Sequence, residues 1–187
     1  MKDSPQLLDV HIYGDEVLRK IAAPVTSFDT ELQDYCADLA FTMYERDGVG
    51  LASPQVGVSR RIFVFDPHYS RENVPPNPIF VINPVIESFS GEVAGDEGCI
   101  SIPDIYAEVT RHKDITVKYQ DLAGVEHREE LSGFAAIVFQ HEYDHLDGVL
   151  FTDRVNSLTK LKLTRKLKLM ASTAVNGVNL RVFEDEE

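Results

Sequence analysis

The chain has 187 residues, of which 43% are hydrophobic and 26% are charged. These proportions are ordinary for a globular protein and exclude collagen, a disordered chain and a disulfide-stabilised miniprotein, and the length predicts one domain over residues 1–187. The 18 Lys and Arg against 31 Asp and Glu give a net charge of −13, which excludes nucleic acid and anionic lipid as favoured main ligands.

The first long element predicted is a helix that begins at Thr30. Apolar residues recur at helical spacing over residues 32–43, which places Cys36 on the buried face as an ordinary core thiol. Thr30 with Gln33 fits a capping box. Asp47-Gly48 ends the helix.

Short strands follow in the middle of the chain. Runs of β-branched and aromatic residues, separated by Pro, Gly, Asn and Asp, predict strands at residues 62–65, 80–82, 85–86, 107–109 and 115–119. Asp121 and Gly124 indicate a hairpin turn that leads into a further strand over residues 126–130.

A second helix is predicted from Phe134 to His145, with Ser132 as its cap and Gly148 after its end. Helical spacing puts Phe134, Ile137, Val138, His141 and His145 on one face. Two imidazoles therefore stand at the end of an apolar stripe, and the helix is expected to be central.

The C-terminal region allows two interpretations. Residues 160–163 and 166–169 alternate Lys and Leu with period two, as in a strand, whereas Ser157 in front of them could cap a helix. The sequence leaves both open. The acidic residues 184–187 are expected to form a frayed, solvated tail.

The clearest chemical signal is the segment His-Glu-Tyr-Asp-His at residues 141–145. Histidines four residues apart on a helix project side by side and can bind one metal ion. A carboxylate between them, here Glu142, can reach a metal-bound water as general base. The segment predicts a metal site, and the alternative is two ordinary histidines on a helix.

A catalytic metal site needs a third protein ligand. A metzincin would have His where this chain has Phe151, and the only glutamates after His145 lie in the tail at residues 184–187, which suits a thermolysin-like site poorly. Cys99 remains, in a polar turn over residues 96–101 where a thiolate can reach a metal. Considered alone, Cys99 could also be a small buried residue at a strand start.

A second unusual stretch runs from Gly48 to Gly57. It lacks the third glycine of a dinucleotide-binding loop, because Ser53 stands there, and no phosphate-loop lysine follows. Its glycines allow backbone to approach a substrate closely, and the amide of Gln55 is a neutral hydrogen-bond donor. The alternative is a flexible connection.

Three segments together resemble the signature motifs of the peptide deformylase family, in order, in spacing and nearly in wording. They are Gly48 to Gln55, Glu97 to Ser101 and Gln140 to His145. The resemblance extends from about His11 to Asp153. Ser53 stands where the family usually has Ala, and Ile100 where it usually has Leu; neither departure removes a functional group.

The resemblance implies an α+β fold, with antiparallel β-sheets around a central helix that carries both histidines. It implies an enzyme that removes the formyl group from the N-terminal formyl-methionine of newly synthesised polypeptides and releases formate. It also implies Fe²⁺ as the physiological ion, with Zn²⁺, Ni²⁺ or Co²⁺ able to replace it. The expected partners are N-formylmethionyl nascent peptides, and transient contact with the ribosome is compatible with this interpretation.

The resemblance also assigns roles. Cys99, His141 and His145 hold the metal, and Glu142 moves the proton. The side chain of Gln55 and the backbone N–H of Ile100 stabilise the negative charge that develops on the formyl group. Further residues are expected to bind substrate or to brace the site: Gly48, Val49, Gly50, Leu51, Glu97, Gly98, Arg111, Phe134, Ile137, Val138 and Asp144. For Phe134, Ile137 and Val138 a plain core role stays open.

Two rival functions stay open. One is a zinc endopeptidase of the His-Glu-x-x-His type with another third ligand. The other is a ribosome-associated binding module with a structural metal, against which Glu142 argues, because a closed structural site needs no general base.

A cytoplasmic location is expected. The longest apolar run, residues 134–139, is too short to span a bilayer, and residues 1–6 lack the apolar core of a signal peptide. The two cysteines, Cys36 and Cys99, fit free thiols or a metal ligand in a reducing compartment.

Overall fold

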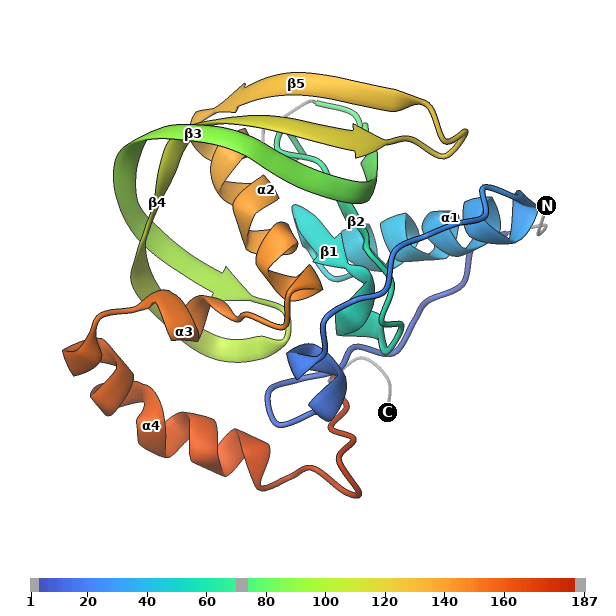
Figure 1. Ribbon diagram of the computed structural model, residues 1–187. Helices are drawn as coiled ribbons and strands as arrows, with labels where there is room; N and C mark the ends of the chain where they lie inside the picture. Colours follow the sequence, from blue (N-terminus) through green and yellow to red (C-terminus); the bar gives the residue numbers. More distant parts are fainter. Residues whose placement is uncertain (1–3, 70–73, 184–187) are drawn as a thin grey trace.

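The computed structural model describes residues 4–69 and 74–183. Within them, five strands pair antiparallel in chain order and form one sheet (Figure 1). The strands are β1 (Gly50–Ala52), β2 (Ile62–Phe65), β3 (Ile79–Cys99), β4 (Ile102–Gln120) and β5 (Glu126–Ser132). The helices are η1 (Glu16–Arg19), α1 (Thr30–Glu45), η2 (Ser53–Val56), α2 (Gly133–Leu146), α3 (Phe151–Arg154) and α4 (Ser157–Ala171). The predicted α+β class is confirmed.

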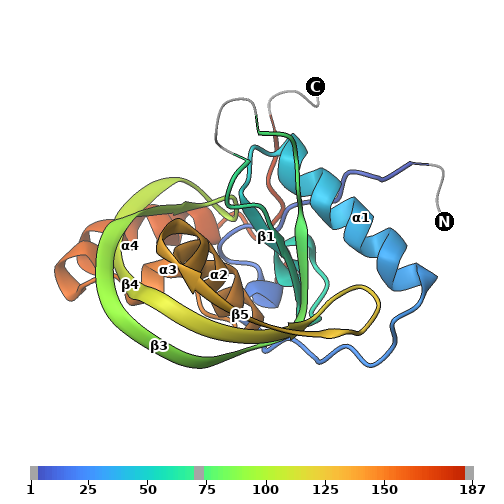
Figure 2. The ribbon, with the colours of Figure 1, turned by 90° about the horizontal axis from the view of Figure 1, so that it is seen from above.

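The two longest strands, β3 and β4, curl around α2. Seen from above, α2 lies inside the curve that β3, β4 and β5 make (Figure 2). The pairing of β3 with β4 shifts register between Ile82 and Val85 and again between Gly98 and Cys99. Such bulges bend a strand and increase its twist, so the sheet can wrap a helix instead of lying flat against it.

The prediction of several short strands was wrong, because pairs of them belong to two long strands. The strands expected at residues 80–82 and 85–86 are parts of β3, and those expected at 107–109 and 115–119 are parts of β4. Asn83-Pro84, which suggested a break, lies within β3 at the first register shift, where Asn83 takes a positive φ of 52°. The hairpin into β5 is confirmed.

An aromatic cluster fixes α2 against the sheet. The ring of Phe139 on α2 meets Phe63 and Phe65 of β2 edge to face, with ring centroids 5.0 and 5.8 Å apart. All three side chains are at most 1% exposed. Burial of a side chain of this size stabilises the fold by about 1.5–3 kcal/mol. The helix that carries the two histidines is therefore held rigidly inside the curled sheet.

Helix α1 packs on the other side of β1 and β2, as the predicted amphipathic pattern requires. The predicted capping box was wrong, because the cap is Asp29, whose side chain accepts a hydrogen bond from the N–H of Leu32 at 3.0 Å, and Thr30 is already helical. Cys36 is 0% exposed, and burial raises the pKa of its thiol to about 12. Cys36 is the core residue that the helical spacing predicted.

The start of α2 differs from expectation in one detail. Ser132 occupies the cap position, but its side chain makes no capping hydrogen bond within the described chain. The backbone at Gly133 has a φ of 59°, which glycine adopts without strain. The helix itself, over Gly133–Leu146, is confirmed.

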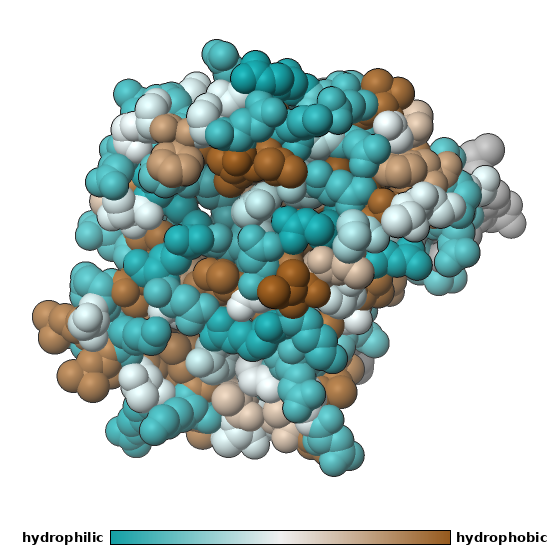
Figure 3. All heavy atoms as spheres, in the orientation of Figure 1, coloured by the Kyte–Doolittle hydropathy of each residue, from teal (hydrophilic) through white to brown (hydrophobic). Residues whose placement is uncertain are grey.

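The structure decides the open choice at the C-terminal region in favour of a helix. Asn156, not Ser157, caps α4 by accepting a hydrogen bond from the N–H of Thr159 at 2.9 Å. Leu158 and Leu161 are 62% and 72% exposed, and hydrophobic spheres mark this end of α4 (Figure 3). Across the two described ranges, no helix combines the length and the apolar character needed to span a bilayer. The predicted tail at residues 184–187 lies outside the described residues.

Candidate active site

Three donor atoms converge where α2 meets the end of β3. The sulfur of Cys99 and one ring nitrogen each of His141 and His145 all lie within 4.8 Å of one another. The Sγ of Cys99 is 3.4 Å from the Nε2 of His145. The register shift between Gly98 and Cys99 occurs at the point where the thiol turns toward α2. The sequence predicted this convergence.

A buried carboxylate orients His141. Glu97 accepts a hydrogen bond from the Nδ1 of His141 at 2.9 Å, which leaves Nε2 free to face the cluster. Arg111 donates two hydrogen bonds to the same carboxylate, from Nε to Oε1 at 2.7 Å and from Nη2 to Oε2 at 2.9 Å. Burial opposes ionisation of Glu97, but the hydrogen bonds from Arg111 and His141 outweigh it and lower its pKa to about 2.

Asp144 completes this buried network. It accepts hydrogen bonds from Arg111 and, on its outer side, from Arg154 of α3. Arg111 is 4% exposed and Asp144 5% exposed, so each buried charge has a partner of opposite sign. The network ties β3, β4, α2 and α3 together directly behind the donor cluster.

Glu142 and His145 each keep one buried atom without a hydrogen-bond partner among the described residues, Oε2 and Nδ1 respectively. Burial, together with the nearby carboxylates of Glu97 and Asp144, raises the pKa of Glu142 to about 7. Burial, together with the positive charges of His141 and Arg111, holds the pKa of His145 well below its ordinary value. His145 is therefore a neutral imidazole, the form that binds metals.

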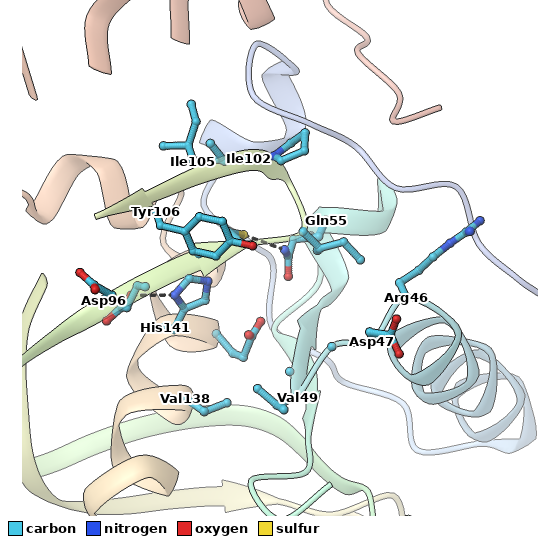
Figure 4. Close-up of a pocket in the computed structure, with 18 of the residues that line it drawn as sticks. Arg46, Asp47, Val49, Gln55, Asp96, Ile102, Ile105, Tyr106, Val138 and His141 are labelled. Atoms are coloured by element: carbon cyan, nitrogen blue, oxygen red, sulfur yellow. Dashed lines mark hydrogen bonds and ion pairs between the residues drawn. The ribbon is translucent and has the colours of Figure 1, made fainter. Parts of the chain in front are cut away.

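The amide of Gln55 points at the same cluster. Its Nε2 donates to the Sγ of Cys99 at 3.3 Å and to the Oγ of Ser101 at 3.1 Å. Its Oε1 accepts from the N–H of Ala52 at 2.8 Å, which fixes the direction of the amide. Figure 4 shows Gln55 reaching toward the sulfur from the side opposite His141.

Two glycines are explained by close contacts and not by backbone conformation. A Cβ at Gly50 would overlap the carboxylate of Glu142, and a Cβ at Gly98 would lie 2.5 Å from the ring of Tyr106. Glycine at these positions lets β1 approach the carboxylate of Glu142 and lets the ring of Tyr106 cover β3.

A cavity of about 460 Å³ opens at the cluster. In Figure 4 its walls come from α2, from the end of β3, from β4 with Tyr106, and from the segment around Val49. The residues of the prediction that line it are Gly48, Val49, Gly50, Gln55, Glu97, Gly98, Cys99, Ile100, Phe134, Ile137, Val138, His141 and Glu142.

Four predicted site residues lie outside the cavity wall, and one of them is Asp144 of the buried network described above. His145 is 1% exposed, and its ring nitrogen joins the donor cluster from the protein interior. Arg111 lies behind Glu97 and acts through its ion pairs. The side chain of Leu51 is 0% exposed and packs with Cys36 and Leu39 in the core beside α1, because alternate residues of β1 face opposite sides.

Sequence reasoning missed several residues of the site. Ser101 shares the amide of Gln55, Tyr106 covers Gly98, and Arg154 pairs with Asp144. Arg46 and Arg181 also line the cavity. Ser101 lay inside a recognised motif, but the other four have no local signal, since their roles depend on how separate helices, strands and turns pack together.

Comparison with known families agrees with this geometry. A family model described as polypeptide deformylase matches residues 7–161. The chain belongs to the polypeptide deformylase family. As a member, it is a metal-binding hydrolase that removes the N-formyl group from nascent polypeptides, as the resemblance implied. Membership does not favour the endopeptidase alternative, nor a binding module without activity.

Individual deformylases are similar over most of their length. The peptide deformylase of Thermotoga maritima is 48% identical over 165 residues, which cover 88% of this chain and 96% of that protein. The crystal structure of a peptide deformylase from Legionella pneumophila superposes with a TM-score of 0.80 at 40% identity, covering 88% of this chain and 95% of that chain. A Met-Ala-Ser-bound peptide deformylase from Acinetobacter baumannii gives 0.74 at 37% identity, covering 80% and 99%.

The departure at Ser53 from the usual deformylase motif has a local explanation. Ser53 is 0% exposed, and its hydroxyl donates to the carbonyl of Val58 at 2.7 Å and contacts the hydroxyl of Tyr35 at 2.6 Å. The extra oxygen is therefore satisfied, and it ties the loop that carries Gln55 to α1.

Proposed function

We propose that deformylation in this chain depends on Glu142 as the group that moves the proton, beside a metal held by Cys99, His141 and His145. The observation that carries the proposal is a buried carboxylate in the wall of a cavity, next to three converging donors, with one oxygen that no described residue hydrogen-bonds. A buried acid with a raised pKa in a cleft is the pattern expected of a general acid–base group.

The donor set fits a metal ion, because one sulfur and two imidazole nitrogens lie close together and one imidazole is held neutral. We propose Fe²⁺ as the ion, with Zn²⁺, Ni²⁺ and Co²⁺ as substitutes, since thiolate and imidazole ligands accept all four. When bound, the ion supplies Lewis acidity that activates water and polarises the formyl group.

Glu142 handles the proton at its Oε2 atom. With a pKa of about 7, the carboxylate takes the proton of the attacking water near neutral pH. The same oxygen returns the proton to the nitrogen of methionine as the bond to the formyl carbon breaks. Gly50 leaves room for this carboxylate in the cavity wall, because a side chain at that position would overlap it.

Gln55 and Ile100 stabilise the charge that develops on the formyl oxygen. The Nε2 of Gln55 already points toward the cluster, held by the bond between its Oε1 and Ala52. The backbone N–H of Ile100, in the turn after Cys99, is the second donor. Donors fixed before the reaction need no reorganisation during it.

The wall formed by Phe134, Ile137 and Val138 suits the methionine side chain. Phe134 is 48% exposed although apolar, which a pure core role would not require. The backbone of residues 48–51 and the end of β3 at Glu97 and Gly98 would flank the rest of the peptide. The Met-Ala-Ser tripeptide bound to the Acinetobacter baumannii relative supports a peptide of this type as the occupant.

The wider assignments follow from the substrate. Nascent polypeptides are made in the cytoplasm, so we place the enzyme there and expect transient contact with the ribosome. We also propose that residues 1–187 form one catalytic domain, with an acidic tail at 184–187, because the described helices and the single sheet surround one site.

The direct test is release of formate from formyl-Met-Ala-Ser. We expect one formate and one Met-Ala-Ser per substrate consumed, and no reaction with acetyl-Met-Ala-Ser, whose larger acyl group crowds the site. Formate is measured by a coupled assay and peptide products by mass spectrometry. Cleavage of internal peptide bonds, with the formyl group left in place, would point to the endopeptidase instead.

The choice of iron has its own test. The Fe²⁺-loaded enzyme should lose activity in air while a Ni²⁺-loaded sample remains active, and mass spectrometry should find added oxygen on Cys99 before Cys36. Cys36 is protected because it is fully buried and its raised pKa keeps the thiol protonated. Equal stability of the two forms in air would contradict the assignment of iron, and oxygen first on Cys36 would contradict the ligand role of Cys99.

A further inference from the structure

The segment of residues 178–183 returns to the mouth of the cavity, although it lies outside residues 7–161 that match the family model. Arg181 is among the residues that line the cavity. Its Nη1 donates a hydrogen bond to the carbonyl oxygen of Ile100 at 2.9 Å. A side chain from the far end of the chain therefore contacts the turn that follows Cys99.

Backbone pairing holds Arg181 in place. Its N–H donates to the carbonyl of Val10 at 2.8 Å, and the N–H of Ile12 donates to the carbonyl of Asn179 at 2.8 Å. The N–H of Asn179 also donates to the buried carboxylate of Asp15 at 2.8 Å. An isolated antiparallel bridge between His11 and Leu180 thus joins residues 10–12 to residues 179–181.

Residues 11–13 also hold the two turns that carry the proposed charge-stabilising donors. The N–H of His11 donates to the carbonyl of Gln55 at 2.8 Å, and the N–H of Tyr13 donates to the carbonyl of Ser101 at 2.8 Å. Together with the hydrogen bond from Arg181 to Ile100, these contacts tie the turn at Gln55 and the turn at residues 100–101 to the paired segments 10–13 and 179–181.

The guanidinium of Arg181 is also packed. The ring of Phe183 contacts two guanidinium groups, and its centroid lies 3.4 Å from the Cζ of Arg46 and 4.7 Å from the Cζ of Arg181. Stacking of this kind restricts the rotamers of a long side chain. Arg46 follows the last residue of α1 at the rim of the cavity, and in Figure 4 its guanidinium points away from Gln55 and His141.

We propose that Arg181 is a positioning residue for deformylation, which fixes the backbone of Ile100 so that its N–H points at the formyl oxygen. The carbonyl and the N–H of Ile100 flank the same Cα, so anchoring the carbonyl limits rotation of the residue. The inference rests on the proposed role of Ile100. It adds that a segment beyond the family match contributes to the rate.

The test replaces Arg181 by Met, which keeps the length of the side chain and removes its donors. We expect kcat for formyl-Met-Ala-Ser to fall about tenfold, less than the loss of a whole oxyanion donor, while KM changes by less than about twofold. Metal content and melting temperature should match those of the wild type. Val182→Ala is the matched control, because that neighbouring side chain is 83% exposed, and it should leave kcat unchanged.

Chemical rescue separates positioning from general support. Methylguanidinium added to Arg181→Ala should restore part of kcat, and it should not affect Val182→Ala. An unchanged kcat in Arg181→Met, a fall accompanied by metal loss, or a complete failure of rescue would each overturn the inference.

A parallel Gln55→Leu variant tests the proposed charge stabilisation separately from the role of Arg181. If Gln55→Leu loses activity and Arg181→Met does not, the inference alone is wrong. If Gln55→Leu keeps full activity, the proposed role of Gln55 is wrong, whereas the inference rests on Ile100 and is still decided by kcat of Arg181→Met.

Discussion

Glu142→Gln should bind as much metal as the wild type. Its kcat should fall by about 10²- to 10⁴-fold, which is the range that general acid–base catalysis contributes. The substitution keeps the shape of a side chain that packs against Gly50, but the amide can neither accept nor return the proton. Formate release and metal analysis on one sample measure both quantities. Glu92→Gln, at an exposed position on β3, is the matched control and should behave as wild type.

Two results would contradict this role of Glu142. Loss of metal together with activity would identify the carboxylate as a metal ligand. A kcat near that of the wild type would show that another group moves the proton. Glu142→Ala adds a check, because it removes the carboxylate without leaving an amide that could bind water in its place.

Cys99→Ser should lose most of its bound metal, and with it nearly all activity. A serine hydroxyl stays protonated and is a weak ligand for the ions that thiolates select. Metal content after exhaustive dialysis, followed by formate release, measures the effect. Cys36→Ala is the control, since that thiol lies in the core beside α1, and it should keep its metal even if it is somewhat less stable. A fully loaded, active Cys99→Ser enzyme would contradict the ligand set.

The metal-capable cluster could be predicted because its signals are local. The spacing of His141 and His145 on a helix depends only on helical periodicity, and Cys99 followed from the lack of a suitable donor after His145. The prediction that Gln55 faces the cluster came from the resemblance, and the structure places its amide 3.3 Å from the sulfur.

The shape of the sheet could not be read from the same sequence. Asn83-Pro84 looks like the end of a strand, and only the pairing with β4 turns it into a bulge. Arg154 and Arg181 likewise gain their roles from partners on other elements, Asp144 at a separation of 10 residues and Ile100 at a separation of 81. Local patterns carry no information on such pairs, and tertiary packing decides them.

The three donor atoms also set an order of events during the synthesis of this enzyme. Cys99 ends β3, whereas both histidines follow β4 and β5, so the complete donor set exists only once α2 has emerged from the ribosome and docked inside the curled sheet. A shorter nascent chain can offer single thiols or imidazoles, which hold a metal far more weakly than the assembled site. An enzyme that processes the first residue of other new chains therefore becomes competent itself only late in its own synthesis.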